Sequence, residues 1–335
     1  MSLPVRNLGR NGPEVNAVGL GFMSLGGIYG SRDSLEHKVS FLEHAHAAGQ
    51  RFWDTADMYL DSEDAVGEWV KRSGNRNDIF IATKFGIQYD PSSGDYNLKI
   101  RSDPEYVREA CEKSLKRLNT TIDLYYCHRI DGVTPIEKTI KAMVELKKYL
   151  GLSEVSAATL RRAHAIYPIS AFQIEYSAFA TDIEWPTIDL LNTCRELGIA
   201  VVAYSPIGRG VLSGQIKTFD DLPENDFRRG LPKYALENFP NIVRLTDGFN
   251  KVAQAHGRTS AQVAIAWLLA QGLDIIPIPG TRSTSRMDEN NAAVLVKLTE
   301  HEVQELRELV DRTEIPGQRY SGAMVENTLR ESVPL

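Results

Sequence analysis

Short hydrophobic runs alternate along the chain with longer segments in which apolar residues recur at helical spacing. The runs are continuous and rich in β-branched and aromatic residues, which is typical of strands buried on both faces of a parallel sheet. We predict eight strands, in the runs AVGLGFM from Ala17, RFWDTA from Arg51, IFIATKF from Ile79, IDLYYCHR from Ile122, YLGLSE from Tyr149, AFQIEYS from Ala171, AVVAYSP from Ala200 and DIIPIPGT from Asp274. Eight strands alternating with helices indicate an α/β protein with one (β/α)8 TIM-barrel domain over residues 1–335.

The helical pattern is clearest between Pro104 and Leu118. Val107 and Cys111 follow one another at a spacing of four, with charged residues on the opposite side. Asp103 precedes the proline, which predicts a helix that begins with an aspartate N-cap and a proline at its first position.

Three segments lie outside the eightfold alternation. Residues 4–18 contain Asn-Gly-Pro at 11–13 and predict a β-hairpin that caps the bottom of the barrel. Residues 207–243 form a long polar insertion after the seventh strand, and residues 311–335 form a tail without strong periodicity. Long loops on a compact domain are commonly functional.

The connection before the fifth strand is unusually short. A predicted helix over Pro135–Leu146 runs through Lys147 and Lys148 directly into the strand from Tyr149. Roughly 2–6 linking residues are normal where a barrel helix returns to the sheet. Either the helix ends early or a loop is missing here. We favour the missing loop and expect a Cα gap between Lys148 and Tyr149.

Composition narrows the class of protein. The formal net charge of −6 argues against a nucleic-acid partner, and no apolar stretch is long enough to cross a membrane. The three cysteines form no CxxC pair and are too few for a disulfide framework. The chain begins without a signal-like segment and reaches the hairpin almost at once. We therefore expect a cytoplasmic protein with no obligate protein partner.

Two short motifs are weak evidence for a dinucleotide fingerprint and for a metal site. Gly19-Leu20-Gly21 starts like a dinucleotide fingerprint, but neither a third glycine nor an acidic residue follows at the required spacing. His44 and His46 point to different sides of a helix, and we expect no metal site.

Polar residues stand at the ends of otherwise apolar runs. They are Asp54, Tyr59, Lys84 and His128, and a barrel brings the carboxyl ends of its strands to one mouth. Reduction of a carbonyl needs a proton donor for the developing alkoxide. A phenol becomes a better donor and base beside an ammonium group, so Tyr59 is the candidate acid and Lys84 supplies the charge. Asp54 would balance Lys84, and His128 would orient the carbonyl oxygen.

Each of these residues has a structural alternative. A single loop tyrosine or core histidine is usually structural, and Asp54 with Lys84 could form an ion pair without a catalytic role. Four such residues at the same end of successive strands favour an active site.

The segments WDTADMY with Tyr59, IATKFG with Lys84, LYYCHRID with His128 and VVAYSPIGRG resemble the signature segments of the aldo-keto reductase superfamily. The similarity is greatest to the branch that includes pyridoxal reductase-like and perakine reductase-like enzymes. It covers nearly the whole chain, in the right order. It implies that Asp54, Tyr59, Lys84 and His128 form the catalytic tetrad.

The same resemblance implies a cofactor site. Ser153, Glu154 and Gln173 match positions around the nicotinamide carboxamide, although the family often has Asn at the second of them. Tyr204 matches the residue that stacks on the nicotinamide. Further matches are in the pyrophosphate loop (Ser205, Ile207, Gly208 and Arg209) and in the adenosine 2′-phosphate motif (Gly280, Thr281, Arg282, Arg286, Glu289 and Asn290). Two arginines can bind phosphate with charge-assisted bonds, which favours NADPH over NADH.

The expected function is NADPH-dependent reduction of an aldehyde or ketone, with a small-molecule carbonyl compound as the substrate. We expect loop residues such as Met23, Tyr89 and Trp185, together with the C-terminal tail, to select the substrate. The alternative is a regulatory subunit that binds NADPH as a redox sensor and turns over little. A hydrolytic phosphate-binding barrel is disfavoured, because the sequence shows neither metal ligands nor a nucleophile–base pair.

Overall fold

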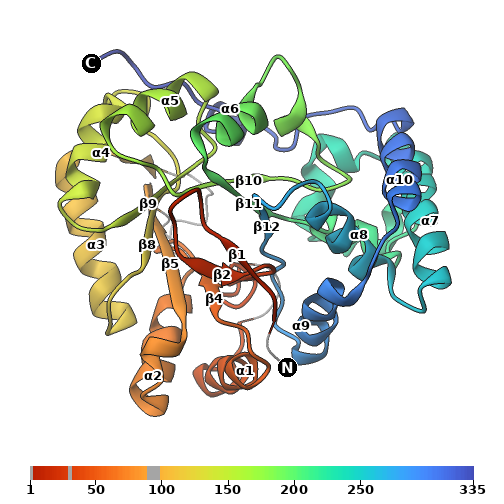
Figure 1. Cartoon of the computed structure of the whole chain (residues 1–335), viewed down its shortest axis with the longest axis horizontal. Coiled ribbons are helices and arrows are strands. Elements are labelled where there is room, and N and C mark those ends of the chain that lie inside the picture. The colour runs from red at the N-terminus through yellow and green to blue at the C-terminus, as the bar shows by residue number, and fades with distance from the viewer. Residues whose placement is uncertain (1–2, 29–31, 89–98) are drawn as a thin grey trace.

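A computed structural model of the chain describes residues 3–28, 32–88 and 99–335, and in it a parallel barrel forms the centre of the protein (Figure 1). Its eight strands, within these residues, are β3 (Leu20–Gly21), β4 (Phe52–Asp54), β5 (Phe80–Phe85), β8 (Leu124–Cys127), β9 (Tyr149–Ser153), β10 (Ala171–Glu175), β11 (Ala200–Tyr204) and β12 (Ile275–Pro277). Each strand pairs in parallel with the next. All eight predicted runs contain one of these strands, so the predicted (β/α)8 fold is confirmed.

The barrel closes where the first strand meets the last. Gly21 forms a parallel bridge with Gly280, and the Gly21 amide donates to the Pro279 carbonyl at 3.3 Å. A Cβ atom on Gly21 would lie 2.9 Å from the Ile278 carbonyl oxygen. Glycine at this position therefore permits the close backbone approach that joins the two edges.

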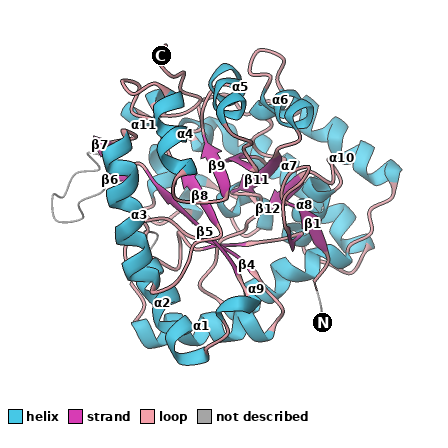
Figure 2. Cartoon of the chain, turned by 60° about the vertical axis from the view of Figure 1, so that its left-hand side comes forward, coloured by secondary structure: helices cyan, strands magenta, loops and turns pink. Residues whose placement is uncertain are grey.

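Helices surround the barrel, as the views from two sides show (Figures 1 and 2). The ring follows the chain through α1 (Leu35–Ala47), α2 (Ser62–Ser73), α3 (Pro104–Leu118), α4 (Ile136–Val144), α5 (Ala157–Ile166), α6 (Leu190–Leu197), α8 (Ser260–Leu269) and α9 (Thr284–Asn291). Helix α9 contacts α1, and helices α7 (Phe239–Ala255) and α10 (Glu300–Arg312) pack against each other outside α8. A parallel sheet needs this cover because both of its faces are apolar.

A hairpin covers the N-terminal ends of the strands. It consists of β1 (Val5–Asn7) and β2 (Glu14–Asn16), which pair antiparallel. Leu8 and Val15 are buried in the same cluster as Phe52 and other side chains of the barrel interior. The predicted capping hairpin is present, and it leaves the opposite mouth of the barrel for a functional site.

The N-terminus of α3 has the predicted cap. The Asp103 side chain accepts a hydrogen bond from the Tyr106 amide, and Pro104 occupies the first helical position. The cap satisfies one of the free amides of the first turn. Val107 and Cys111 lie on the buried face, as their spacing predicts.

The short connection before β9 is made by an early end of α4. The helix stops at Val144, and the Leu146 and Lys147 amides both donate to the Met143 carbonyl. Residues 145–148 then lead into Tyr149, the first residue of β9. The predicted helix end at Leu146 is two residues too late, and the Cα gap stays a prediction.

The long insertion and the tail extend across the C-terminal side of the barrel. After β11 come five short 3-10 helices, which are η3 (Gly208–Ser213), η4 (Phe219–Asp221), η5 (Phe227–Gly230), η6 (Pro232–Tyr234) and η7 (Leu236–Asn238). The tail contains α11 (Ala323–Glu326). The remaining short elements are β6 (Ile87–Gln88), β7 (Lys99–Ile100), η1 (Arg76–Asp78), η2 (Asp182–Glu184) and η8 (Ala292–Leu295).

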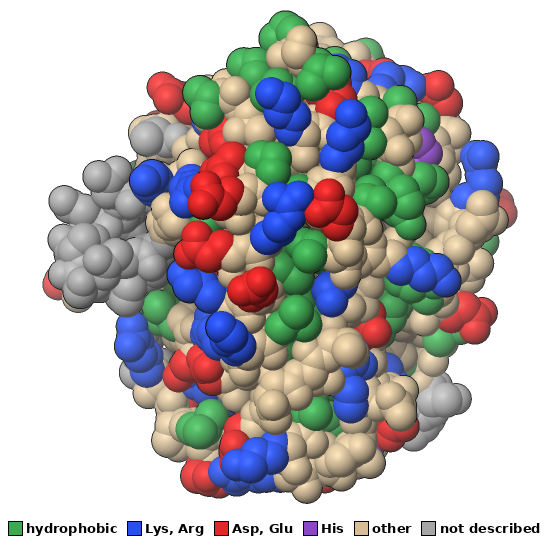
Figure 3. All heavy atoms as spheres, turned by 90° about the vertical axis from the view of Figure 1, so that its left-hand side faces the viewer, with side chains coloured by type: hydrophobic (Ala, Val, Ile, Leu, Met, Phe, Trp, Pro, Cys, Tyr) green, Lys and Arg blue, Asp and Glu red, His purple; other side chains and the backbone are tan. Residues whose placement is uncertain are grey.

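Charged side chains of both signs are mixed with scattered apolar ones on the face that Figure 3 shows. In the described residues, no helix combines the length and apolar character that a membrane-spanning segment requires.

Candidate active site

The four polar residues predicted for catalysis meet at the C-terminal mouth of the barrel. Asp54 is the last residue of β4, and Lys84 lies near the end of β5. His128 follows β8 directly, and Tyr59 lies in the turn between β4 and α2. Their strands are neighbours in the sheet order, which explains why residues so far apart in sequence come together.

Asp54 and Lys84 form a fully buried ion pair. Lys84 Nζ lies 2.5 Å from Asp54 Oδ1 and donates to the Thr55 carbonyl at 2.6 Å. The second carboxylate oxygen accepts a hydrogen bond from Gln173 Nε2 at 2.8 Å. Burial raises the pKa of Asp54 and lowers that of Lys84, while their mutual attraction opposes both shifts. The pair fixes the ammonium group with one side toward Tyr59.

Tyr59 stands between Lys84 and His128. Its hydroxyl oxygen is 3.5 Å from Lys84 Nζ, and its ring meets the His128 ring edge-on at a centroid distance of 5.9 Å. Burial, reinforced by the negative charge of Asp54, raises the pKa of Tyr59, whereas Arg129 opposes the shift. Tyr59 therefore holds its proton at neutral pH, as a proton donor must.

His128 is a neutral imidazole in this setting. Burial, with the nearby charges of Arg129 and Lys84, keeps the pKa of His128 well below its ordinary value. Its Nδ1 atom is buried and has no hydrogen-bond partner among the described residues. A neutral ring carries one N–H, so donation toward the cavity requires the proton on Nε2.

Behind Tyr204 lies a second cluster of charged residues, which ties the C-terminal tail to the barrel. Arg319 binds both oxygens of Glu154, at 2.8 and 2.9 Å, and the Tyr204 hydroxyl donates to Glu154 Oε1 at 2.8 Å. The Tyr204 and Tyr320 hydroxyls are 2.9 Å apart. Although burial opposes it, the attraction of Arg319 and Arg129 holds the pKa of Glu154 at about 2.

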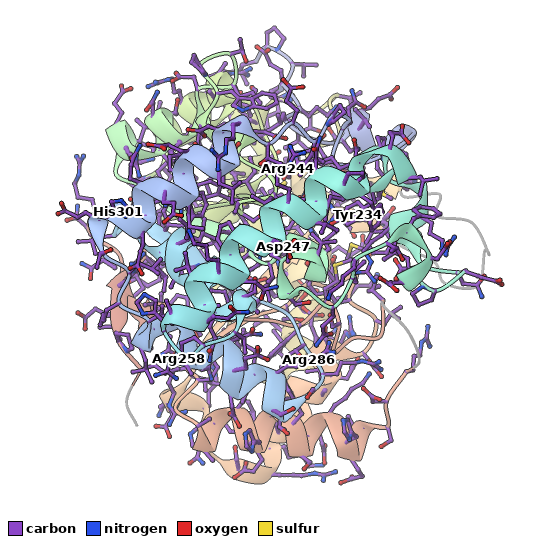
Figure 4. All side chains as sticks on the ribbon, turned by 90° about the vertical axis from the view of Figure 1, so that its right-hand side faces the viewer. Tyr234, Arg244, Asp247, Arg258, Arg286 and His301 are labelled. Carbon is purple, nitrogen blue, oxygen red and sulfur yellow. The ribbon has the colours of Figure 1, made fainter. Side chains whose placement is uncertain are left out.

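A cavity of about 830 Å³ opens at this mouth. Its lining includes Tyr59, His128 and the apolar side chains of Met23, Met58 and Ile87. The lining also includes Arg282, just before α9, and Arg286, which lies in α9 and is labelled in Figure 4. The cavity is therefore large enough for an extended ligand as well as a small substrate.

Most of the residues predicted for cofactor binding line this cavity. They are Gln173, Tyr204, Ser205, Ile207, Arg209, Gly280, Thr281, Arg282, Arg286, Glu289 and Asn290. Arg282 also pairs with Asp33 at 3.2 Å, and Arg286 donates to Gln215 at 3.3 Å.

Three predicted cofactor residues lie behind the cavity wall. The Glu154 carboxylate is occupied by Arg319 and Tyr204, so it supports Tyr204 instead of facing the cavity. Ser153 accepts a hydrogen bond from Arg129, and Gly208 accepts one from the Tyr234 hydroxyl.

The predicted substrate-selecting residues have different outcomes. Met23 lines the cavity, as do Tyr320, Met324, Asn327 and Thr328 of the tail. Trp185 is 52% exposed and is not part of the lining, so its prediction is wrong. It follows η2, and its indole remains largely in solvent. Tyr89 lies outside the described residues.

Two features of the site were missed at the sequence level. Arg129 follows His128 in the same hydrophobic run, and its place next to a strand end was the signal that could have identified it. Arg319 and Tyr320 belong to a tail without periodicity, and only the tertiary fold brings them to the site.

Comparison with known proteins places this geometry in a family. Residues 17–311 match the aldo/keto reductase family, and the chain therefore belongs to that family. It is an enzyme, an oxidoreductase that acts on carbonyl compounds.

Two relatives are similar over almost their full length. One is the aldo-keto reductase str7 of Strobilurus tenacellus, 49% identical over 97% of this chain and 98% of the relative. The other is the aldo-keto reductase yakc [NADP(+)] of Schizosaccharomyces pombe, which is 45% identical over 100% of this chain and 99% of the relative.

Solved structures show the same fold. A glycerol dehydrogenase of Gluconobacter oxydans superimposes with a TM-score of 0.81 at 27% identity, over 95% of this chain and 98% of that one. A thermostable aldo-keto reductase in complex with the inhibitor epalrestat gives a TM-score of 0.72 at 28% identity, over 92% of this chain and 100% of that one.

Proposed function

We propose that the protein reduces aldehydes or ketones to alcohols with NADPH, and that Tyr59 is the general acid. The observation that carries this proposal is the position of Tyr59 at the cavity wall. Its hydroxyl lies 3.5 Å from an ammonium group that is itself fixed by a buried carboxylate.

The residues of the cavity fit NADPH. The site extends from Tyr59 to two arginines, and Arg282 and Arg286 carry the positive charge that a 2′-phosphate needs. Three non-glycine residues at this mouth, Glu154, Ser205 and Arg209, have positive φ values of 50–54°. Such strained backbone is concentrated at binding sites. One relative is named with NADP(+), which supports the same cofactor here.

The roles of the binding residues follow from their places. Arg282 and Arg286 would hold the 2′-phosphate, with Asn290 and Glu289 beside the adenosine. Residues of the insertion, such as Arg209, would cover the pyrophosphate, and Tyr204 and Gln173 would hold the nicotinamide. When bound, NADPH supplies the hydride that the carbonyl carbon accepts.

The protein's own residues handle the proton. Tyr59 donates its hydroxyl proton to the carbonyl oxygen as negative charge develops there. Lys84 stabilises the phenolate that remains, and Asp54 with Gln173 holds Lys84 in place. His128 donates from Nε2 to the same oxygen and orients it. The buried setting strengthens each of these interactions.

The test compares Tyr59→Phe with a matched control, Tyr125→Phe. Tyr125 is buried on β8 and its hydroxyl contacts the Val107 carbonyl at 3.4 Å, away from the cavity. With an activated aromatic aldehyde, we expect Tyr59→Phe to lose turnover about 10²–10⁴-fold and to keep its NADPH affinity. Tyr125→Phe should stay close to wild type.

The kinetic result tests both the role of Tyr59 and the choice between an enzyme and a redox-sensing subunit. Substantial turnover by Tyr59→Phe would remove Tyr59 from the role of acid. Tight NADPH binding by the wild type without turnover across a broad aldehyde panel would favour a redox-sensing subunit instead.

A further inference from the structure

Arg129 is a buried guanidinium group beside the catalytic residues. It is 9% exposed, it follows His128, and it lines the cavity together with Tyr59. Its Nη1 atom is fixed by the His128 carbonyl at 2.6 Å and by Ser153 Oγ at 3.1 Å. The side chain is therefore held in one position at the mouth of the barrel.

The other two nitrogen atoms of this guanidinium group remain available. Among the described residues, Arg129 Nε and Nη2 have no hydrogen-bond partner, and neither is among the buried polar atoms that lack one. They therefore keep access to the cavity that the residue lines.

The charge of Arg129 also lacks a direct partner. Within the described part of the chain, no carboxylate oxygen lies within 4.0 Å of its guanidinium group. The acid that attracts it most, Glu154, already binds Arg319 through both oxygens. Burial opposes the charged form, but Glu154 and nearby hydroxyls raise the pKa of Arg129, which stays protonated. An unpaired buried charge is costly and marks a functional site.

We infer that Arg129 selects carbonyl substrates that carry a carboxylate next to the reacting carbonyl, and that it binds this carboxylate through Nε and Nη2. The inference rests on the proposed function, because it places the reacting carbonyl at Tyr59 and His128. These two nitrogen atoms form one edge of the planar guanidinium fork, which matches the two oxygens of a carboxylate.

The surroundings favour an anionic substrate group over another neutral contact. The cavity lining includes the uncharged side chains of Met58, Ile87, Ile100 and Met324. The carboxylate of Asp54 in the same lining is already bound by Lys84 and Gln173. A nicotinamide carboxamide is neutral and needs only neutral donors, so it would leave the guanidinium charge uncompensated. A 2-oxo acid would compensate that charge and place its keto group within reach of the residue before Arg129.

The experiment uses two substrates with the same skeleton, phenylglyoxylate and its uncharged methyl ester. The kcat/KM of each is measured with NADPH for the wild type, Arg129→Met and Arg129→Lys. The exposed Arg244 on α7, labelled in Figure 4, gives the matched control Arg244→Met. We expect the acid-to-ester ratio of kcat/KM to fall about 10- to 100-fold in Arg129→Met. Most of the loss should be in KM, Arg129→Lys should lose less, and Arg244→Met should keep the wild-type ratio.

A binding measurement makes the inference independent of turnover. Isothermal titration calorimetry with phenylglyoxylate and NADP⁺-loaded protein should show binding to the wild type and a matching loss in Arg129→Met. The wild type alone also tests the idea, because phenylglyoxylate must bind more tightly than the ester. This comparison remains valid if Arg129→Met fails to fold.

The other possible results distinguish failure of the Arg129 inference from failure of the proposed function. Equal losses for acid and ester, or weaker NADPH binding with an unchanged ratio, would overturn the inference and assign Arg129 to the positioning of His128 and Ser153 or to the cofactor. Turnover of the ester by a wild type that does not bind the acid would overturn the inference and leave the proposed function intact. Binding of phenylglyoxylate through Arg129 without any turnover would support the anion site and contradict the proposed function.

Discussion

Replacement of Lys84 by methionine tests the buried ion pair at the base of the site. Lys84 is fully buried, and its ammonium group contacts Asp54, the Thr55 carbonyl and the Tyr59 hydroxyl. Methionine has a similar length and no charge, so the variant removes the cation without leaving a large cavity. Asp54, 1% exposed, would retain the hydrogen bond from Gln173.

The expected loss of stability is large. Removal of one partner from a buried ion pair costs about 3–5 kcal/mol, because it leaves an uncompensated charge. Burial already raises the pKa of Asp54, and without Lys84 that pKa rises further. A carboxyl whose folded-state pKa exceeds its unfolded-state pKa stabilises the fold below the unfolded value and loses this effect as the pH rises through the folded value. The penalty of Lys84→Met should therefore be greater at pH 8 than at pH 5.

Urea unfolding followed by tryptophan fluorescence measures the free energies of unfolding at both pH values. The double variant Lys84→Met/Asp54→Asn removes both charges and should recover at least half of the loss at pH 8. Wild-type stability in Lys84→Met, or a double variant as unstable as the single one, would refute the reasoning from buried charge.

Three further predictions concern other parts of the molecule. Glu154→Gln should lower the free energy of unfolding at pH 7 by about 2 kcal/mol, since Arg319 loses both charged bonds to Glu154 and keeps only its ion pair with Asp182. Because Arg319 outweighs burial and holds the pKa of Glu154 at about 2, its contribution is complete above about pH 4.5 and disappears toward pH 2. A stability difference that persists unchanged at pH 2 would contradict this. Arg282→Ala should weaken NADPH binding about 10- to 100-fold in a fluorescence titration and leave NADH binding nearly unchanged, whereas equal losses would exclude a 2′-phosphate contact. Burial raises the pKa of the Cys127 and Cys194 thiols, so both should react with a thiol reagent only after unfolding, and rapid labelling of the native protein would show the burial to be wrong.

The hydrophobic pattern predicted the number and order of the barrel strands correctly. It predicted the residues at which strands and helices end less accurately. The run from Ala17 to Met23 contains a strand of only two residues, because the pattern records burial and not the ladder of hydrogen bonds. The end of α4 was predicted too late for a similar reason. Leu146 continues the apolar spacing, but the chain must turn after Val144 to reach β9.

The candidate site likewise contains some residues that the sequence predicts and others that it does not. Asp54, Lys84 and His128 stand out as polar residues at the ends of buried strands, and this position is determined by the sequence order of the barrel. Arg319 is tied to Glu154 across 165 positions of the chain. No local pattern marks such a contact, because it depends on where the tail crosses the finished fold.

Transfer of a labelled hydride tests the central claim most directly. The wild-type protein would be incubated with NADPH carrying two deuterium atoms at C4 and with an aromatic aldehyde, and the alcohol would be analysed by mass spectrometry. The proposed function predicts one deuterium atom at the carbinol carbon of every product molecule. Alcohol without deuterium, or no alcohol at all from a range of carbonyl compounds, would contradict it.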